Sequence, residues 1–500
     1  MSRSSGILLH PTCFPSAFGI GDLGKSAYKF IDFLASSHQK LWQVLPLGPT
    51  GFGNSPYMCY SAIAGNPLLI DLEPFLEMGL LQAQECQAQF PSDIVDFERV
   101  IPYKMGLLKI VFERFNQECD RFYDLAQRFQ QFCTAEQDWL EDYALFMALL
   151  DQHQGSAWNS WAPELARRKP EAIATAKQSL KHQIQFHQFL QFQFFQQWQE
   201  LRAYANRNQI QIIGDIPIYV AHNSADVWLN PQNFKLDPET FAPAQMAGVP
   251  PDYFSTTGQL WGNPVYDWEY LAETGFAWWV KRFKSMERLV DLIRIDHFRG
   301  FESYYQVAAG HTDARLGTWQ PAPGAALFEK IAQELGSLPI LAEDLGVITP
   351  EVEQLRDRFN FPGMRVLLFA FGGDHSNIHL PHHYVKNSCV YTGTHDNDTA
   401  VGWWLKANPS ERELLLNYFD LTSGTVHAEN IHWRLIRAAI ASVADLAIFP
   451  LQDVLGLDNS ARMNRPGLTI SNWNWRYGDS DILTPDLSDR LKQLCQTYGR

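Results

Sequence analysis

The sequence predicts an α/β protein built as a TIM (β/α)8 barrel, and three observations indicate this fold. Eight short apolar runs with strand character are spread along the 500 residues. Stretches of helical periodicity separate most of them, which is the alternation typical of a parallel sheet. No Gly-rich dinucleotide fingerprint follows an early strand, which disfavours the alternative, a doubly wound open sheet. Barrels with insertions reach this length as one unit, so we expect a single catalytic domain over residues 1–500.

The first two runs and the helix between them form a βαβ unit. Residues 7–10 and 42–47 are the predicted strands, and residues 25–36 form an amphipathic helix between them. The loop that follows, residues 48–57, is rich in Gly and Pro. Loops after barrel strands build active sites, so Ser55 and Tyr57 in this loop are candidate substrate contacts. The alternative is that both are ordinary turn residues.

Residues 50–205 predict a largely helical insertion between barrel strands 2 and 3. Residues 68–72 (Leu-Leu-Ile-Asp-Leu) are compatible with a strand, but the rest is helical and rich in Gln, Phe and Trp. Apolar residues recur at helical spacing within 184–201, Phe189 and Trp198 among them. An aromatic stripe of this kind indicates packed core rather than a ligand face.

The strand–helix alternation then returns and supplies six more barrel strands. A buried strand at residues 212–218 is followed by a long loop insertion, residues 219–272, which we expect to lie over the active site. The remaining strands are predicted at residues 292–296, 340–345, 364–370, 389–393 and 446–451.

Composition describes a globular chain with a large core and no acidic partner. Hydrophobic residues make up 46% and charged residues 19% of the sequence, and the formal net charge is −15. Nucleic acid and anionic membrane surfaces require basic patches, so neither is an expected partner. Aromatic residues are abundant, with 33 Phe, 18 Tyr and 16 Trp, and exposed Trp and Tyr would suit the flat faces of sugars.

Cysteine usage and the N-terminal residues favour a cytoplasmic location. The seven cysteines are scattered and include no Cys-x-x-Cys pair, which is typical of reduced thiols without a zinc cluster. The first residues lack the apolar region of a signal peptide, and no apolar run is long enough to span a membrane.

The stretch Leu-Ile-Arg-Ile-Asp-His-Phe-Arg-Gly-Phe, residues 292–301, carries the strongest local signal for chemistry. Ile293 and Ile295 alternate with Arg294 and Asp296, which is the two-residue period of a strand. Arg294 and Asp296 therefore point the same way, and the cation keeps the carboxylate ionised by lowering its pKa. Such a carboxylate at the end of an inner strand could serve as a nucleophile, or the pair could be a structural ion pair.

Carboxylates recur at the ends of other strands, at Glu343, at Asp396 and earlier at Asp215. In a barrel these side chains converge on one mouth. Glycoside chemistry uses such a set, with one carboxylate that attacks and one protonated acid for the leaving oxygen. The alternative is a divalent metal site completed by histidines, but a guanidinium beside Asp296 would compete with the cation.

Several motifs resemble those of one protein family. Arg294-Ile-Asp-His, Ala342-Glu-Asp-Leu-Gly and Thr394-His-Asp-Asn are similar to conserved regions of the α-amylase superfamily. The surrounding sequence resembles one branch of it, the amylomaltases (4-α-glucanotransferases or disproportionating enzymes, glycoside hydrolase family 77). The stretches that carry this resemblance span the chain: Trp42-Gln-Val-Leu-Pro-Leu-Gly-Pro, Asn54-Ser-Pro-Tyr, Gly65-Asn-Pro-Leu, Asp215-Ile-Pro-Ile, Ser224-Ala-Asp-Val-Trp, Gly248-Val-Pro-Pro-Asp-Tyr-Phe-Ser, Gln259-Leu-Trp-Gly-Asn-Pro, Arg462-Met-Asn and Asn472-Trp-Asn-Trp-Arg.

The resemblance implies a role for each candidate residue. Asp296 matches the nucleophile, Glu343 the general acid/base and Asp396 the third carboxylate, which stabilises the transition state. The implied substrate contacts are Tyr57, Asp215, Tyr253, Gln259, Trp261, Arg294, His395 and Asn464. The loop 248–255 matches a lid-like segment over the acceptor side. Asp344 is easily mistaken for a catalytic residue, but as a strand neighbour of Glu343 it should face away.

The implied activity is transfer of α-1,4-glucan segments between maltooligosaccharides or starch-like glucans through a covalent glycosyl-enzyme, without a cofactor or a metal. An α-amylase-type hydrolase and a non-catalytic glucan-binding protein are the alternatives. Two positions depart from the family pattern: Asn223 stands where an acid is frequent, and Leu468 where a threonine is expected. The sequence leaves oligomeric state and glucan length preference open.

Overall fold

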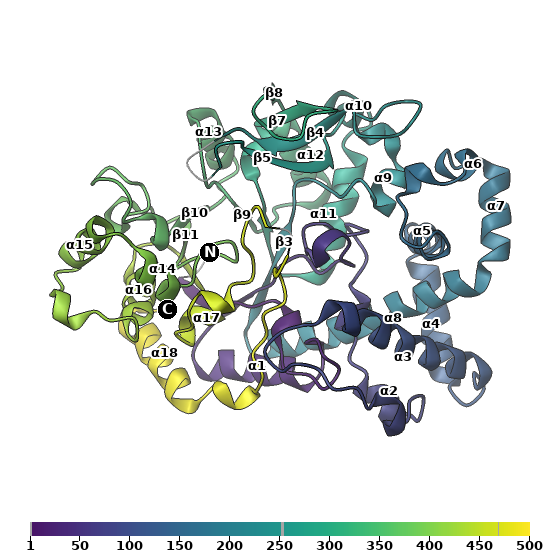
Figure 1. The fold of residues 1–500 in the computed structure, drawn as a ribbon, viewed down its shortest axis with the longest axis horizontal. Helices are drawn as coiled ribbons and strands as arrows, with labels where there is room; N and C mark the ends of the chain where they lie inside the picture. Colours follow the sequence, from purple (N-terminus) through teal and green to yellow (C-terminus); the bar gives the residue numbers. More distant parts are fainter. Residues whose placement is uncertain (1–2, 252–254, 469) are drawn as a thin grey trace.

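Eight parallel strands form the barrel at the centre of the computed structural model, which describes residues 3–251, 255–468 and 470–500 (Figure 1). Neighbours in the sheet follow the order β10-β11-β12-β1-β2-β3-β6-β9, so barrel strands that follow each other in sequence lie side by side. A hydrogen bond from Ala342 N to Pro362 O at 2.9 Å links the ends of the series next to β9 and β10. The strand bounds are β1 Ser4–Leu8, β2 Leu41–Gln43, β3 Gln211–Ile216, β6 Leu292–Ile295, β9 Ile340–Ala342, β10 Gly363–Val366, β11 Ser388–Tyr391 and β12 Leu446–Pro450. The TIM-barrel prediction is confirmed.

Helices surround the barrel, and they form where the sequence places an apolar stripe on one side. Helix α1 covers Lys25–Ser36, the predicted range, and buries Phe30, Ile31 and Leu34. Helix α18 packs against both α1 and α16, so the last helix of the chain lies beside the first. Helices that lie between barrel strands or follow the last one include α1 Lys25–Ser36, α8 Lys181–Arg207, α11 Ala277–Leu289, α12 Gly324–Leu335, α13 Pro350–Arg358, α14 Ala400–Lys406, α15 Pro409–Tyr418, α16 Ile431–Ala441, α17 Leu451–Val454 and α18 Pro485–Tyr498.

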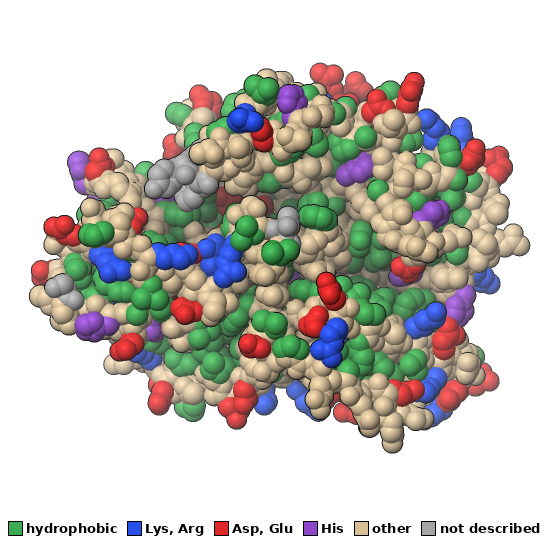
Figure 2. All heavy atoms as spheres, in the orientation of Figure 1, with side chains coloured by type: hydrophobic (Ala, Val, Ile, Leu, Met, Phe, Trp, Pro, Cys, Tyr) green, Lys and Arg blue, Asp and Glu red, His purple; other side chains and the backbone are tan. Residues whose placement is uncertain are grey.

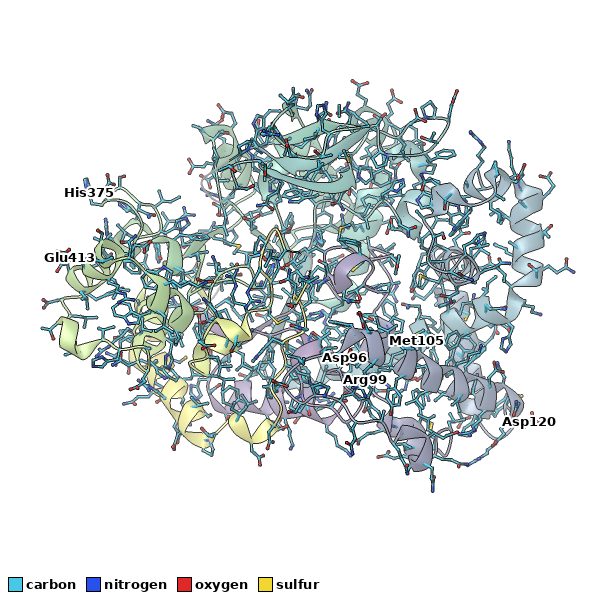
Figure 3. All side chains as sticks on the ribbon, in the orientation of Figure 1. Asp96, Arg99, Met105, Asp120, His375 and Glu413 are labelled. Carbon is cyan, nitrogen blue, oxygen red and sulfur yellow. The ribbon has the colours of Figure 1, made fainter. Side chains whose placement is uncertain are left out.

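The chain between β2 and β3 is helical and extends to one side of the barrel. Its aromatic residues pack against α8, where Phe115 and Phe189 stack with ring centroids 5.0 Å apart. Figure 3 shows α3 starting near Asp96 and Arg99 in the middle of the molecule and running towards Asp120 at its edge, on the side opposite His375 and Glu413. The helix bounds in this region are α2 Glu73–Glu77, α3 Phe97–Gln117, α4 Tyr123–Ala135, α5 Leu140–Gln152, α6 Pro163–Ala166 and α7 Pro170–Ser179.

The strand considered possible at residues 68–72 is wrong. Pro67–Leu69 form a short 3-10 turn, and the Asn66 side chain accepts a hydrogen bond from Leu68 N at 3.0 Å. Pro67 fixes its own φ and lacks an N–H, which favours a capped turn over a ladder. The apolar run reflects the burial of Leu68 and Leu69 and does not indicate an extended backbone.

A second sheet of four antiparallel strands lies beside the barrel, in the order β5-β4-β7-β8 (Figure 1). Its strands are β4 Gln245–Val249, β5 Gln259–Pro264, β7 Ser303–Ala308 and β8 Thr318–Pro321. The expected long loop 219–272 therefore contains two strands, and it also holds the short helices α9 Ala225–Leu229 and α10 Trp268–Glu273. Strand β4 pairs with β7, although β6 lies between them in the sequence. A partner this far away leaves no local signal in the sequence.

The face of the molecule in Figure 2 is hollowed near its centre, and Asp and Glu side chains are visible inside the hollow. Elsewhere on this face, acidic and basic side chains are interspersed. Among the described residues, no helix combines the length and the apolar character needed to cross a membrane.

Candidate active site

The predicted carboxyl groups all lie at the carboxyl ends of barrel strands. Asp215 is the penultimate residue of β3, and Asp296, Glu343 and Asp396 follow β6, β9 and β11. The register brings the first of these segments together, because Asp296 N donates to Ile216 O at 2.9 Å and Glu343 N to Ile295 O at 3.0 Å. The barrel therefore gathers side chains from distant parts of the sequence at one mouth.

Arg294 organises one side of this mouth. Its Nη1 donates to Asp215 Oδ2 at 2.6 Å, and its Nη2 lies 3.0 Å from Asp296 Oδ1. The Asp215 side chain is fully buried, whereas that of Asp296 is 30% exposed and faces the open mouth. Burial alone would lower the pKa of Arg294, but the two carboxylates outweigh it and hold this pKa well above its usual range. The guanidinium is a permanent cation beside Asp296.

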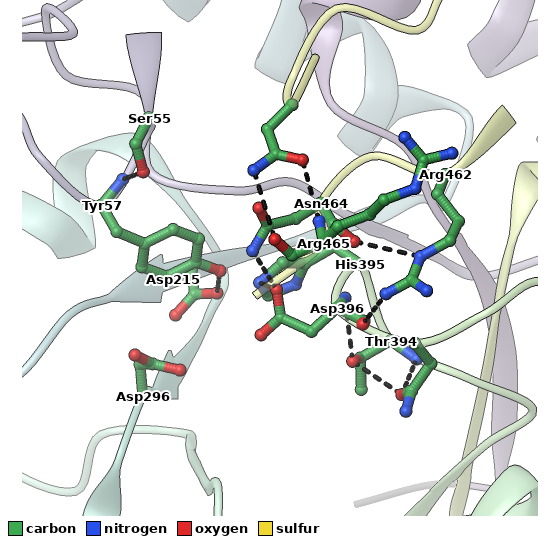
Figure 4. A network of polar contacts seen from close by, with 12 residues as sticks. Ser55, Tyr57, Asp215, Asp296, Thr394, His395, Asp396, Arg462, Asn464 and Arg465 are labelled. Atoms are coloured by element: carbon green, nitrogen blue, oxygen red, sulfur yellow. Dashed lines mark hydrogen bonds and ion pairs between the residues drawn. The ribbon is translucent and has the colours of Figure 1, made fainter. Parts of the chain in front are cut away.

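Tyr57 completes this group from the loop after β2. Its hydroxyl donates to Asp215 Oδ2 at 2.8 Å (Figure 4). Burial, reinforced by the charge of Asp215, raises the pKa of Tyr57, so the phenol keeps its proton and remains a donor. Burial also raises the pKa of Asp215, and Arg294 opposes that shift.

Glu343 has a different electrostatic environment from Asp296. Burial, followed by the negative charge of Asp296, raises the pKa of Glu343 to about 8, although Arg294 and two backbone donors act the other way. Those donors are His297 N, 2.6 Å from Oε2, and Leu345 N, 2.9 Å from Oε1. They fix the orientation of the carboxyl group while it stays largely protonated at neutral pH. A protonated carboxyl group beside a second carboxyl group that is paired with a cation is the arrangement that acid-assisted displacement requires.

Asp396 lies on the opposite side of the mouth with His395 and Asn464 (Figure 4). Asn464 Nδ2 donates to Asp396 Oδ1 at 2.6 Å, and His395 Nε2 lies 3.3 Å from the same oxygen. Burial lowers the pKa of His395, which favours the neutral imidazole. The His395 ring stacks on Tyr57 with centroids 5.1 Å apart, so the two sides of the site are in contact.

Gln259 and Trp261 reach the site from β5 of the second sheet. Both are half-buried, and Gln259 Oε1 accepts a hydrogen bond from Trp261 Nε1 at 3.2 Å. The ring of Trp261 packs edge-on against the ring of His297, with centroids 5.0 Å apart. His297 directly follows Asp296 in the chain. Tyr253, the remaining predicted contact, lies outside the described residues.

Asp344 faces away from the site, as expected for a strand neighbour of Glu343. Its Oδ2 lies 2.5 Å from Arg356 Nη1 and 3.5 Å from Arg365 Nη1, and its Oδ1 accepts from Met364 N at 2.6 Å. Gly363 is required beside it, because a Cβ there would lie 2.4 Å from Asp344 Oδ2. Asp344 is a structural ion partner between β9, β10 and α13.

The described residues contain no group of three or more His, Cys, Asp or Glu side chains arranged to hold a metal ion. At the mouth, Arg294 engages oxygens of both Asp215 and Asp296, which leaves these carboxylates poor ligands for a cation.

Two further residues shape the site, although no role was predicted for either. The Trp473 ring lies 5.8 Å from the rings of both Tyr57 and His395, and its φ of 64° is in the left-handed region. Arg462 Nη2 donates to Asp396 O at 2.6 Å. Both belong to stretches that carry the family resemblance, but their contacts are between distant segments and leave no spacing signal.

The barrel and its mouth define the class of protein. A parallel (β/α)8 barrel that holds an arginine-paired carboxylate beside a protonated acid is typical of enzymes that cleave or transfer glycosidic bonds. The chain belongs to glycoside hydrolase family 77, whose family model, described as 4-α-glucanotransferase, matches residues 9–481.

Relatives match the chain over its whole length. The 4-α-glucanotransferase of Synechocystis is 56% identical over 502 residues, covering 100% of this chain and 98% of the relative. That of Thermus thermophilus is 46% identical over 503 residues, with coverage of 100% and 99%. The structure of an amylomaltase from Streptococcus agalactiae in complex with acarbose matches with a TM-score of 0.94 at 38% identity and covers 100% of this chain and 99% of that one.

Proposed function

We propose that the protein is a 4-α-glucanotransferase that moves α-1,4-glucan segments between maltooligosaccharides by a retaining double displacement. The observation that carries this proposal is the contrast between the two carboxyl groups. Asp296 is paired with Arg294 and exposed to the mouth, whereas the pKa of Glu343 is raised to about 8, chiefly by burial. One is suited to attack and the other to give a proton.

In the first step, an Asp296 oxygen attacks the anomeric carbon of the donor glucan. The bond from that carbon to the glycosidic oxygen breaks, and Glu343 transfers its proton to this oxygen as the leaving chain departs. In the second step, the 4-hydroxyl of an acceptor gives its proton to Glu343 and attacks the same carbon. The ester bond to Asp296 breaks, and two inversions leave the α configuration unchanged.

The charges explain how Glu343 alternates between acid and base. The negative charge of Asp296 is the second-largest cause of the raised pKa of Glu343. This charge disappears when Asp296 becomes an ester, so the pKa of Glu343 falls after it has given up its proton. Glu343 is then a carboxylate, ready to accept the proton of the acceptor hydroxyl.

The other residues at the mouth bind and orient the sugar. Asp396, held by Asn464 and His395, accepts hydrogen bonds from sugar hydroxyls and stabilises positive charge at the anomeric carbon. Tyr57 and Asp215 line the donor site on the side of the mouth opposite Asp396. Gln259 and Trp261 contact the acceptor glucan. No cofactor takes part in these steps.

Maltotriose separates transfer from its alternatives. A transferase should convert it into glucose and a ladder of longer chains, with the total of reducing ends nearly constant. The wild type is compared with Asp296→Asn, which retains the binding surface but lacks the nucleophile and should give no ladder. Reducing ends that rise in step with maltotriose consumption would show a hydrolase. Binding without any product would show a glucan-binding protein.

Transfer requires that a sugar hydroxyl outcompete water at the covalent intermediate. Orientation of a bound acceptor can give an effective molarity of roughly 10⁵ M or more, which exceeds that of water at about 55 M. The half-buried Trp261, packed against His297 next to Asp296, is placed to hold such an acceptor. Trp261→Ala should shift the ratio of transfer to hydrolysis towards water, and an unchanged ratio would remove this role from Trp261.

A cytoplasmic location is consistent with the cysteines. All seven lie within the described residues and are free thiols. A reducing compartment keeps thiols in this state.

A further inference from the structure

The side chain of Arg462 joins the two chain segments that build the Asp396 side of the mouth (Figure 4). Its Nη2 donates to Asp396 O at 2.6 Å, and its Nε donates to Asn464 O at 3.2 Å. Asn464 in turn donates from Nδ2 to Asp396 Oδ1 at 2.6 Å. One guanidinium therefore holds the backbone of the carboxylate residue and the backbone of the residue that orients its side chain.

The charge of Arg462 is compensated away from the substrate. Its Nη1 forms an ion pair with Asp398 Oδ1, and Asp398 Oδ2 also lies 3.2 Å from Lys406 Nζ. The side chains of Arg462 and Asp398 are 13% and 19% exposed, so the pair is largely shielded from solvent. Arg462 contacts the carbonyl of Asp396 rather than its carboxylate. The carboxylate oxygens thus keep their capacity to accept hydrogen bonds from a sugar.

Other contacts with Asp396 are longer. Asp396 N donates to Thr394 Oγ1 at 3.3 Å, and His395 Nε2 lies 3.3 Å from Asp396 Oδ1. The shortest contacts of Asp396 come from Arg462 and from Asn464. Arg462 also donates to the backbone carbonyl of Asn464, so it contacts both residues of that hydrogen-bonded pair.

We propose that Arg462 is a positioning residue for Asp396 and that Asp398 positions Arg462. This inference rests on the proposed function, because it assigns Asp396 the role of third carboxylate. The planar guanidinium offers several donors in a fixed fork, which lets it bond Asp398 and two carbonyls at once. A lysine keeps the charge but carries its donors on a single nitrogen at the end of a flexible stem, so it cannot reproduce the three separated contacts together.

Arg462→Lys tests the proposal, with Arg465→Lys as the matched control. Arg465 has the same charge three residues further on, but its Nη2 donates to Asn459 O at 2.8 Å. A misplacement of a reacting group by ~1 Å can cost ~10²-fold in rate. Arg462→Lys should therefore lower kcat for maltotriose disproportionation by about 10²-fold while KM changes by less than about threefold. Arg465→Lys should stay within about twofold of the wild type on both constants. Equal effects of the two substitutions would overturn the proposal.

A double-mutant cycle distinguishes positioning of Asp396 from a general structural role. In an Asp396→Asn background the target of Arg462 has lost its function, so adding Arg462→Lys should reduce the residual kcat by less than about threefold. A further reduction of about 10²-fold would show that Arg462 acts elsewhere.

Asp398→Asn provides a second variant should Arg462→Lys unfold. It leaves Arg462 and its two carbonyl contacts in place but removes the ion partner, and kcat should fall about tenfold with KM nearly unchanged. An unchanged kcat in Asp398→Asn would refute its role. A wild type that gives no ladder from maltotriose would refute the proposed function itself. An active wild type with an unaffected Arg462→Lys would refute only the positioning role.

Discussion

The raised pKa of Glu343 predicts how turnover depends on pH. Glu343 must carry a proton in the first step, and burial together with the charge of Asp296 raises its pKa to about 8. A group with this pKa is about 90% protonated at pH 7 and about 10% protonated at pH 9. With Glu343 as the acid, kcat/KM for maltotriose should be lost as pH rises through 8, falling about tenfold between pH 7 and pH 9.

An unperturbed glutamate would give a different profile. With the ordinary pKa of 4.5, the protonated fraction already falls tenfold per pH unit above about pH 5. The loss between pH 7 and pH 9 would then be about 10²-fold. The two cases differ by about a factor of ten over a range that ordinary buffers cover.

The assay measures the initial rate of glucose release at maltotriose concentrations well below KM, from pH 5 to pH 10 at constant ionic strength. The matched donor is α-glucosyl fluoride, whose leaving group departs without protonation. Its kcat/KM reports formation of the same covalent intermediate and should not fall at pH 8. A tenfold loss of kcat/KM per pH unit with maltotriose that already begins near pH 5 would refute the raised pKa of Glu343. Identical profiles for the two donors would refute the assignment of Glu343 as the acid.

Three further predictions concern the nucleophile, the neighbouring aspartate and metal ions. Asp296→Asn should lower kcat by roughly 10⁴-fold or more while calorimetry still detects maltooligosaccharide binding, and a slow fluorinated donor should label the wild type on Asp296; a label on Glu343 would contradict the assignment. Asp344→Asn should destabilise the fold by about 3–5 kcal/mol in urea unfolding, because it removes the buried carboxylate that Arg356 and Arg365 share, whereas the exposed Asp357→Asn should cost no more than about 1 kcal/mol; similar midpoints would argue against the buried ion pair. Dialysis against EDTA should leave the disproportionation rate unchanged, and an activity that is lost and then restored by a divalent metal would refute a metal-free mechanism.

The barrel could be predicted from the sequence because its strands are buried and strongly apolar. The pattern is less informative about where each strand ends. The predicted strand 364–370 is shorter in the structure, where β10 covers Gly363–Val366 and Leu367–Phe369 form a 3-10 turn. Leu367 and Leu368 remain buried, so hydrophobicity predicted burial correctly but not the backbone conformation. Residues 68–72 were misread for the same reason.

The second sheet could not be predicted, because its central pairing, β4 with β7, joins two segments that other elements separate in the sequence. Strand β4 is only partly buried and pairs with β7, on the far side of β6 in the sequence. Without knowledge of that partner, residues 245–264 have the composition of a loop.

The site was predictable to the extent that it follows strand geometry. The period of two predicted that Arg294 and Asp296 share a face, and they form the expected pair. The second bond of Arg294, to Asp215, depends on the register between β3 and β6, which the sequence does not specify. The contacts of Arg462 and Trp473 depend in the same way on how a late segment returns to the mouth.

The pairing of β1 with β12 has a consequence for protein synthesis. Strand β1 ends at Leu8, whereas its partner begins at Leu446, so a nascent chain exposes one edge of β1 until β12 has left the ribosome. At roughly 5–20 residues per second, this wait lasts roughly 20–90 s. An unpaired strand edge is a template for intermolecular pairing. Aggregation therefore competes with closure of the barrel during the interval before β12 pairs with β1. Chaperones that shield nascent chains should therefore increase the yield of folded protein most when translation is slow.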